Sequence, residues 1–149
     1  MKPSSDEAAP LVSPTISVLC ADDNQHVADA MKITFERAGG FAWTGWLPGA
    51  DTVIETVLRD RTSIVILDID MPGRNPFDVI EELSDKCPWC RAVMFSGHVR
   101  YELIERAFVA GAWGYVSKND GEAALMQAVR DVCRDELAMS LEVRAVYGR

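Results

Sequence analysis

Short apolar runs alternate with segments of helical periodicity five times along this chain, and this alternation limits the possible folds most strongly. The clearest run, SIVIL at residues 63–67, is unbroken and typical of a strand buried on both faces of a sheet. Further runs predict strands at residues 16–20, 41–46, 92–95 and 113–116. The chain is therefore expected to be an α/β protein with a parallel sheet and helices on both faces. Right-handed crossovers favour the flavodoxin-like strand order 2-1-3-4-5.

The segments between these runs predict helices. After the first run, Val27, Met31 and Phe35 recur at four-residue steps, and Gly39-Gly40 supplies a stop. Further helices are expected at residues 50–60, 77–83 and 100–110, with a last one that begins near residue 121.

The chain has 149 residues, of which 48% are hydrophobic, enough to form the core of one domain. We expect a flexible leader at residues 1–14, one domain at residues 15–136, and a tail or the start of a linker at residues 137–149. The net charge of −8 argues against direct binding of nucleic acid. Neither a secretory signal nor an apolar stretch of about 20 residues is present, so a cytoplasmic protein is expected.

Polar residues stand directly after four of the five predicted strands, where open parallel sheets bind ligands. They are Asp22, Asp23, Asp68, Asp70, Ser96 and Lys118. Several carboxylates at one place need a cation, and a site made only of oxygen ligands favours Mg²⁺. A lysine and a hydroxyl could then bind a phosphoryl group, so the set has the parts that phosphoryl transfer requires. Taken singly, each residue could equally be a turn residue, a cap or a solvated charge.

Four motifs carry a family resemblance: VLCADDN, VILDIDMPG, VMFSG and GAWGYVSKND, in that order. On these motifs the chain resembles the receiver domains of two-component response regulators, and the resemblance extends over about residues 16–135. The resemblance implies that Asp68 is the phosphoacceptor. It also implies that Asp22 and Asp23 hold Mg²⁺, with Asp23 favoured as the direct ligand, and that the backbone carbonyl of Asp70 completes the protein's ligands.

The same resemblance gives Ser96 and Lys118 the role of binding the phosphoryl group. Tyr115 matches the aromatic residue that turns inward when the hydroxyl residue moves, so the face made by the fourth helix, fifth strand and fifth helix would change shape. The implied donor is a phosphohistidine on a histidine kinase or a phosphotransfer protein. Dimerisation on phosphorylation is a further expectation, while the downstream effector is not identified by the sequence.

Two positions depart from many receivers. Pro76 stands where a glycine is common, which predicts an altered loop and an intact site, because proline is acceptable at a first helical position. Asn119 follows the lysine where many receivers have proline. In this respect the chain resembles receivers of the nitrate-responsive, helix-turn-helix type, which carry a DNA-binding output domain. The chain is thus either a stand-alone receiver or the receiver half of a DNA-binding regulator.

Cys87 and Cys90 form a CxxC pair that could be a redox pair or half of a zinc site. The pair precedes a strand and lacks suitably spaced further ligands, so packing is the expected role. Core packing is also the expected role of Trp43, Trp46 and Trp113, although Trp113 could mark a partner surface.

Two other functions compete with a phosphorylated receiver. The Asp68-Ile69-Asp70 sequence resembles the nucleophile motif of haloacid-dehalogenase-like phosphatases, but those enzymes have the acidic pair last and the nucleophile first, the reverse of this chain. A pseudo-receiver, an interaction module that is never phosphorylated, is the other alternative, and the complete set of site residues argues against it.

Overall fold

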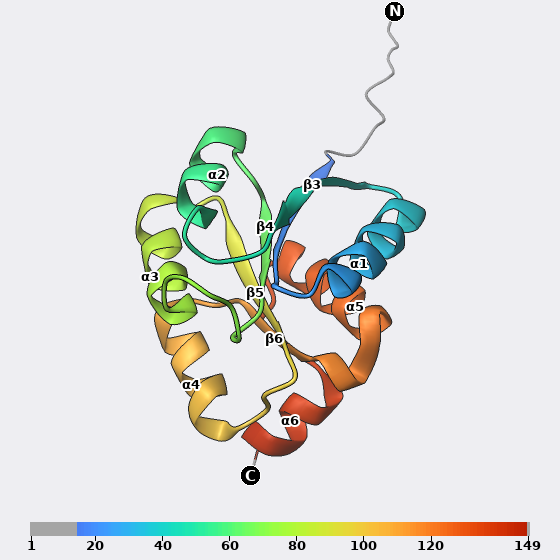
Figure 1. The fold of residues 1–149 in the computed structure, drawn as a ribbon. Coiled ribbons are helices and arrows are strands. Elements are labelled where there is room, and N and C mark those ends of the chain that lie inside the picture. Colours follow the sequence, from blue (N-terminus) through green and yellow to red (C-terminus); the bar gives the residue numbers. More distant parts are fainter. Residues whose placement is uncertain (1–14, 149) are drawn as a thin grey trace, which may run out of the picture.

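A six-stranded parallel sheet forms the centre of the computed structural model, which describes residues 15–148 (Figure 1). The strand order is β3-β2-β4-β5-β6-β7. The strands are β2 (Ile16–Ala21), β3 (Phe41–Leu47), β4 (Ile64–Leu67), β5 (Arg91–Ser96), β6 (Gly114–Ser117) and β7 (Ala138–Met139). The predicted flavodoxin-like order is confirmed, with β7 as a minor addition beside β6. The predicted leader at residues 1–14 lies outside the described residues.

Helices cover both faces of the sheet, as the alternation predicted. They are α1 (Gln25–Ala38), α2 (Val53–Asp60), α3 (Pro76–Lys86), α4 (Tyr101–Ala110), the short 3₁₀ helix η2 (Lys118–Asp120), α5 (Gly121–Cys133) and α6 (Leu141–Tyr147). α2, α3 and α4 lie over one face, and α1 and α5 lie over the other (Figure 1).

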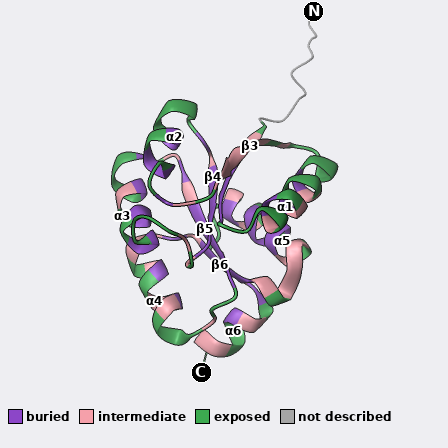
Figure 2. Cartoon of the chain, in the orientation of Figure 1, coloured by how far each residue is buried: buried purple, intermediate pink, exposed green. Residues whose placement is uncertain are grey.

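The central strand β4 explains why the sheet has two cores. All four of its residues are buried, and they alternate between the faces. Val65 and Leu67 join the core under α2, α3 and α4, whereas Ile64 and Ile66 join the core under α1 and α5. Figure 2 shows the buried positions along the strands and on the inner sides of the helices. The carboxyl ends of the strands are therefore held rigidly from both sides.

Local sequence fixes where the helices beside that edge begin. Asn24 caps α1, since its side-chain oxygen accepts hydrogen bonds from the backbone N–H groups of His26 and Val27. Asn75 caps α3 in the same way, and Pro76 occupies the first helical position. Proline is thus accommodated at the start of α3, while the altered loop and the intact site remain predictions.

The segment expected to be a tail or linker contains ordered structure. β7 pairs with β6, and α6 packs beside α4 and β6 with Val143 completely buried (Figure 1). The division of the chain into 15–136 and 137–149 remains a prediction.

None of the helices in the described part of the chain is long and apolar enough to cross a bilayer.

Candidate functional site

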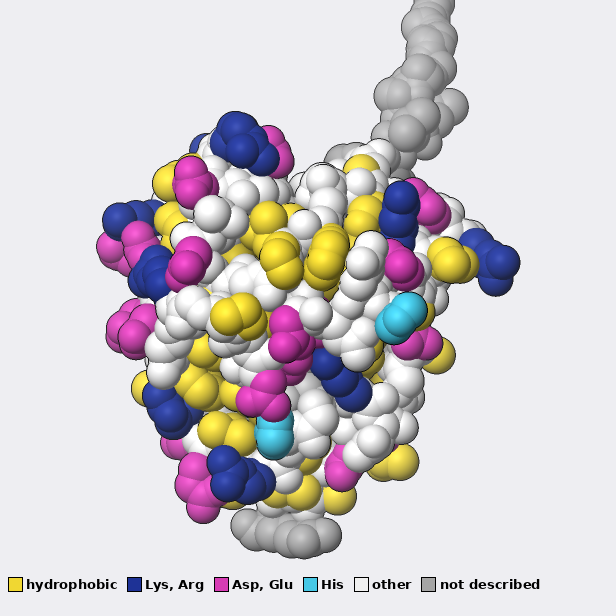
Figure 3. Space-filling model, viewed as in Figure 1, with side chains coloured by type: hydrophobic (Ala, Val, Ile, Leu, Met, Phe, Trp, Pro, Cys, Tyr) yellow, Lys and Arg dark blue, Asp and Glu magenta, His cyan; other side chains and the backbone are white. Residues whose placement is uncertain are grey.

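The polar residues named from the sequence gather at the carboxyl edge of the sheet. This edge faces the reader in Figure 3, where acidic, basic and histidine side chains lie together near the centre of the view. Asp22 follows β2, Asp68 follows β4, Ser96 ends β5 and Lys118 follows β6. Parallel strands in this order bring all four residues to one edge, as the sequence predicted.

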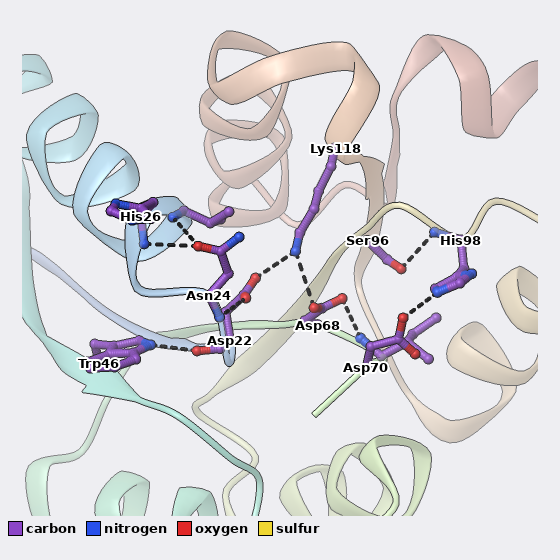
Figure 4. Close-up of polar contacts among 11 residues, drawn as sticks. Asp22, Asn24, His26, Trp46, Asp68, Asp70, Ser96, His98 and Lys118 are labelled. Atoms are coloured by element: carbon purple, nitrogen blue, oxygen red, sulfur yellow. Dashed lines mark hydrogen bonds and ion pairs between the residues drawn. The ribbon is translucent and has the colours of Figure 1, made fainter. Parts of the chain in front are cut away.

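Lys118 joins the two buried carboxylates of the site (Figure 4). Its ammonium nitrogen lies 2.8 Å from Asp22 Oδ2 and 3.1 Å from Asp68 Oδ2. Asp22 is 1% exposed and Asp68 is 5% exposed, so neither carboxylate is well hydrated. The other oxygen of Asp68 accepts a hydrogen bond of 2.8 Å from the backbone N–H of Ile69. Lys118 therefore offsets part of the negative charge of these two carboxylates and orients Asp68.

Asp68 remains electrostatically strained despite this partner. Burial raises the pKa of Asp68, the positive charge of Lys118 opposes that effect, and the negative charge of Asp22 adds to it. The net pKa lies above the ordinary value for aspartate. Further positive charge at this carboxylate would thus be favourable.

Lys118 shows the opposite balance. Burial acts to lower the pKa of its ammonium group, but the hydrogen bond that this group donates to Asp22 and the charges of Asp68 and Asp22 outweigh burial. The pKa of Lys118 is raised, so this side chain is a permanent cation near neutral pH.

A third carboxylate completes a set of oxygen ligands. Carboxylate oxygens of Asp22, Asp23 and Asp68 all lie within 4.8 Å of one another, and Asp23 is exposed while the other two are buried. Hard divalent cations prefer such ligands and retain water on their open side, which the exposed Asp23 permits. These residues therefore fit Mg²⁺.

The turn that carries Asp22 and Asp23 is held by two neighbours (Figure 4). The backbone N–H of Asn24 donates to Asp22 Oδ1 at 2.8 Å, and the indole N–H of Trp46 donates to the backbone carbonyl of Asp22. Neither residue is among the site residues predicted from the sequence. Asn24 could have been predicted as a helix cap next to Asp22 and Asp23. No pattern in the sequence indicates the direction of the Trp46 side chain.

Ser96 and Tyr115 are connected through the backbone of His98. Ser96 Oγ accepts a hydrogen bond of 3.0 Å from the N–H of His98, and the hydroxyl of Tyr115 donates to the carbonyl of His98 at 2.6 Å. Both side chains are fully buried, and burial raises the pKa of Tyr115 to about 12. Tyr115 thus points inward in this structure.

Asp70 and His98 pair at the rim of the site, where the His98 ring nitrogen Nε2 contacts Asp70 Oδ2 (Figure 4). Both side chains are at least half exposed, so this pair is accessible to solvent.

The cysteine pair lies between α3 and β5, away from the site, in surroundings that disfavour the reactive thiolate. Cys87 is 0% exposed and Cys90 is 6% exposed. Burial raises the pKa of the Cys87 thiol, and it raises that of Cys90 to about 12. Thiolates are the reactive form, so this environment favours packing over redox chemistry.

We therefore expect that Cys87 and Cys90 stay unmodified when the native protein is treated with iodoacetamide under mildly alkaline conditions. Cys133, which is partly exposed, should be modified first. Peptide mass spectrometry would check this, with a denatured sample as the control in which all four cysteines react. Rapid labelling of Cys90 in the native protein would contradict the packing role.

The sequence pattern of one known family matches most of the chain. The family is described as the response regulator receiver domain, and the match covers residues 18–130. The chain belongs to this family. The predicted resemblance is confirmed, and the comparisons do not favour a phosphatase or a pseudo-receiver.

Relatives of the receiver are named as transcriptional regulators. The transcriptional regulatory protein MctR of Rhizobium johnstonii is 30% identical over 135 residues, which cover 91% of this chain and 58% of that protein. DesR of Bacillus subtilis is 26% identical over 117 residues, covering 78% of this chain and 58% of that protein. The receiver thus spans less than two thirds of the length of these relatives.

Solved structures agree with this assignment. A LuxR-family response regulator from Aurantimonas sp. SI85-9A1 superposes with a TM-score of 0.84 at 25% identity, covering 90% of this chain and 96% of that one. The isolated REC domain of RcsB from Salmonella enterica serovar Typhimurium, solved with the phosphomimetic BeF₃⁻, has a TM-score of 0.82 at 16% identity. That alignment covers 89% of this chain and 98% of the other, and it supports the fold alone.

Proposed function

We propose that the receiver accepts a phosphoryl group on Asp68 in a Mg²⁺-dependent reaction. The observation that carries this proposal is the buried Asp68 carboxylate, which lies at a strand end between Lys118 and two further carboxylates. A nucleophilic carboxylate, a fixed cation and a metal-binding set are the parts that phosphoryl transfer to aspartate uses.

The proposed donor is a phosphohistidine on a histidine kinase or a phosphotransfer protein. One Asp68 oxygen forms a bond to phosphorus while the bond from phosphorus to the donor imidazole breaks. The electron pair of that bond returns to the imidazole nitrogen, and the product is an acyl phosphate. Lys118 already contacts the acceptor carboxylate, so its ammonium group can also bind the phosphoryl oxygens and stabilise their negative charge.

Asp22, Asp23 and Asp68 would hold Mg²⁺, together with the backbone carbonyl of Asp70. When bound, the ion would offset the repulsion between these carboxylates and the incoming phosphoryl group. Asp23 is the exposed member and would be the direct ligand nearest to solvent.

Ser96 and Tyr115 would convert phosphorylation into a change of shape. If the Ser96 hydroxyl turns to donate to a phosphoryl oxygen, the N–H of His98 loses its present acceptor. The hydroxyl of Tyr115 donates a hydrogen bond to the carbonyl of the same residue. A shift of the His98 backbone would therefore also move the Tyr115 side chain. The face made by α4, β6 and α5, part of which β7 and α6 cover in this structure, would then change shape, and its exposed part would bind an output partner or a second copy of the chain. Since the relatives are transcriptional regulators, a DNA-binding output is the proposed downstream step.

Intact mass after incubation with a small-molecule phosphodonor tests this function. Wild type is expected to gain one phosphoryl group with Mg²⁺ and none when Mg²⁺ is chelated. Asp68→Asn should gain none, because the nucleophilic oxygen is replaced by an amide.

Asp78→Asn is the matched control, since Asp78 is an exposed carboxylate on α3. This variant should be phosphorylated like wild type. A folded wild-type protein that never gains mass would favour the pseudo-receiver, and equal labelling of Asp68→Asn would show that another residue is the acceptor.

A further inference from the structure

Within residues 15–148, Trp46 is the one tryptophan that donates a hydrogen bond to the turn at Asp22 and Asp23. It lies on β3 next to β2, in register with Cys20, and its indole N–H donates to the backbone carbonyl of Asp22 (Figure 4). That carbonyl belongs to the peptide group that links Asp22 to Asp23. The indole hydrogen bond therefore restrains the orientation of the peptide group that precedes Asp23.

The same edge of β3 makes a second bond to Asp22. The backbone N–H of Asp22 donates to the carbonyl of Leu47 at 3.0 Å, so residues 46 and 47 bind both backbone polar groups of Asp22. On the other side, Asn24 binds the Asp22 carboxylate. The buried Asp22 is thereby held on each side, whereas the exposed Asp23 depends for its direction on the peptide group before it.

We propose that Trp46 is a positioning residue for the metal site, which acts by holding the Asp22–Asp23 peptide group so that the Asp23 carboxylate faces the other two. The proposal rests on the Mg²⁺ site proposed above. Groups that orient metal ligands preorganise the site, and their loss weakens metal binding without removing any ligand.

Trp43 provides a comparison within the same strand. Its ring packs near Phe35, with 6.2 Å between ring centroids, on the core under α1 and α5. Trp46 also packs against that core. Trp46 differs from Trp43 in its hydrogen bond to the backbone of Asp22. Substituting each tryptophan in turn therefore distinguishes an effect of core packing from an effect of this hydrogen bond.

The test is isothermal titration of the unphosphorylated protein with Mg²⁺, which needs no phosphoryl transfer. Trp46→Phe keeps an aromatic ring and removes the N–H, and it is expected to weaken Mg²⁺ binding about tenfold. Trp43→Phe should bind Mg²⁺ like wild type. Phosphorylation of Trp46→Phe should need more Mg²⁺ to reach half its maximal rate, while the rate at saturating Mg²⁺ stays near that of wild type.

A cycle with Asp23→Asn shows whether Trp46 acts through Asp23. If it does, Trp46→Phe has little further effect on Mg²⁺ affinity in the Asp23→Asn background. Equal Mg²⁺ affinity of wild type and Trp46→Phe, or additive effects in the cycle, would overturn the positioning role and leave the proposed function intact. A wild-type protein that binds no Mg²⁺ would overturn both. Thermal unfolding of each variant without Mg²⁺ shows whether the substitution destabilises the whole domain. If Trp43→Phe and Trp46→Phe lose Mg²⁺ affinity equally, the loss reflects packing and the proposal is wrong.

Discussion

Replacing Val143 with aspartate is expected to lower the free energy of unfolding by about 2–4 kcal/mol. Val143 on α6 is 0% exposed and packs into the core under α2, α3 and α4. A carboxylate there would lose hydration without a partner, so α6 would leave the surface or the whole domain would unfold.

Release of α6 would also expose β6, which explains the size of the expected effect. The N–H groups of Ala138 and Ser140 donate to the carbonyls of Trp113 and Tyr115, and Ser140 Oγ accepts from the N–H of Ser117. Ser117 is fully buried, so its N–H group would lose its partner at some cost. The open edge of β6 would in addition favour association between chains.

Leu141→Asp is the matched control, because Leu141 lies in the same helix and is 70% exposed. Its free energy of unfolding should stay within about 0.5 kcal/mol of the wild-type value. Urea denaturation followed by tryptophan fluorescence would compare the three proteins. If Val143→Asp has the same free energy of unfolding as Leu141→Asp, the packing of α6 does not stabilise the domain. That result would support the predicted domain boundary at residue 136.

The sequence showed the sheet because its central strands are buried on both faces. The run at residues 63–67 is apolar without interruption, and such a run is readable without knowing its neighbours. The site followed from the sheet, since any polar residue after a parallel strand must lie at one edge. This is why Asp68 and Lys118, which are far apart in the chain, could be paired from the sequence.

The C-terminal elements could not be read in this way. β7 has only two residues, too few for a pattern of alternation. In α6 the exposed Leu141 and the buried Val143 are both apolar, so composition does not distinguish the face that packs. The hydrogen bond from Trp46 to Asp22 and the contact of Asp70 with His98 depend on side-chain directions, which no spacing in the sequence specifies.

Asp68→Asn is expected to raise the free energy of unfolding in the absence of Mg²⁺ by about 0.5–2 kcal/mol, while it abolishes phosphorylation. Burial and the charge of Asp22 act against the Asp68 carboxylate, and Lys118 offsets them only in part. A neutral amide avoids the desolvation of a charge and can still accept from Lys118. Urea denaturation near neutral pH measures the difference, and Asp78→Asn serves as the control that should change stability little.

The dependence of this difference on pH follows from the raised pKa of Asp68. Because the folded protein binds the proton more tightly than the unfolded chain, wild type gains stability as pH falls through the folded pKa toward the ordinary value of about 3.9. The advantage of Asp68→Asn is therefore complete above the folded pKa and disappears below both values. An advantage that grows as pH falls would contradict the raised pKa.

Mg²⁺ should reverse the order of stability. An ion that binds only the folded form of the proposed site should stabilise wild type by about 2.7 kcal/mol at 100 times its dissociation constant. Asp68→Asn lacks one of the three carboxylates and should gain much less. If the variant were less stable than wild type even without Mg²⁺, the attraction between Lys118 and Asp68 would outweigh burial, and the acceptor would be a stabilising ion pair. With the expected reversal, the proposed Mg²⁺ site would compensate the unfavourable burial of the Asp68 carboxylate, which the folded protein keeps for its proposed role as acceptor.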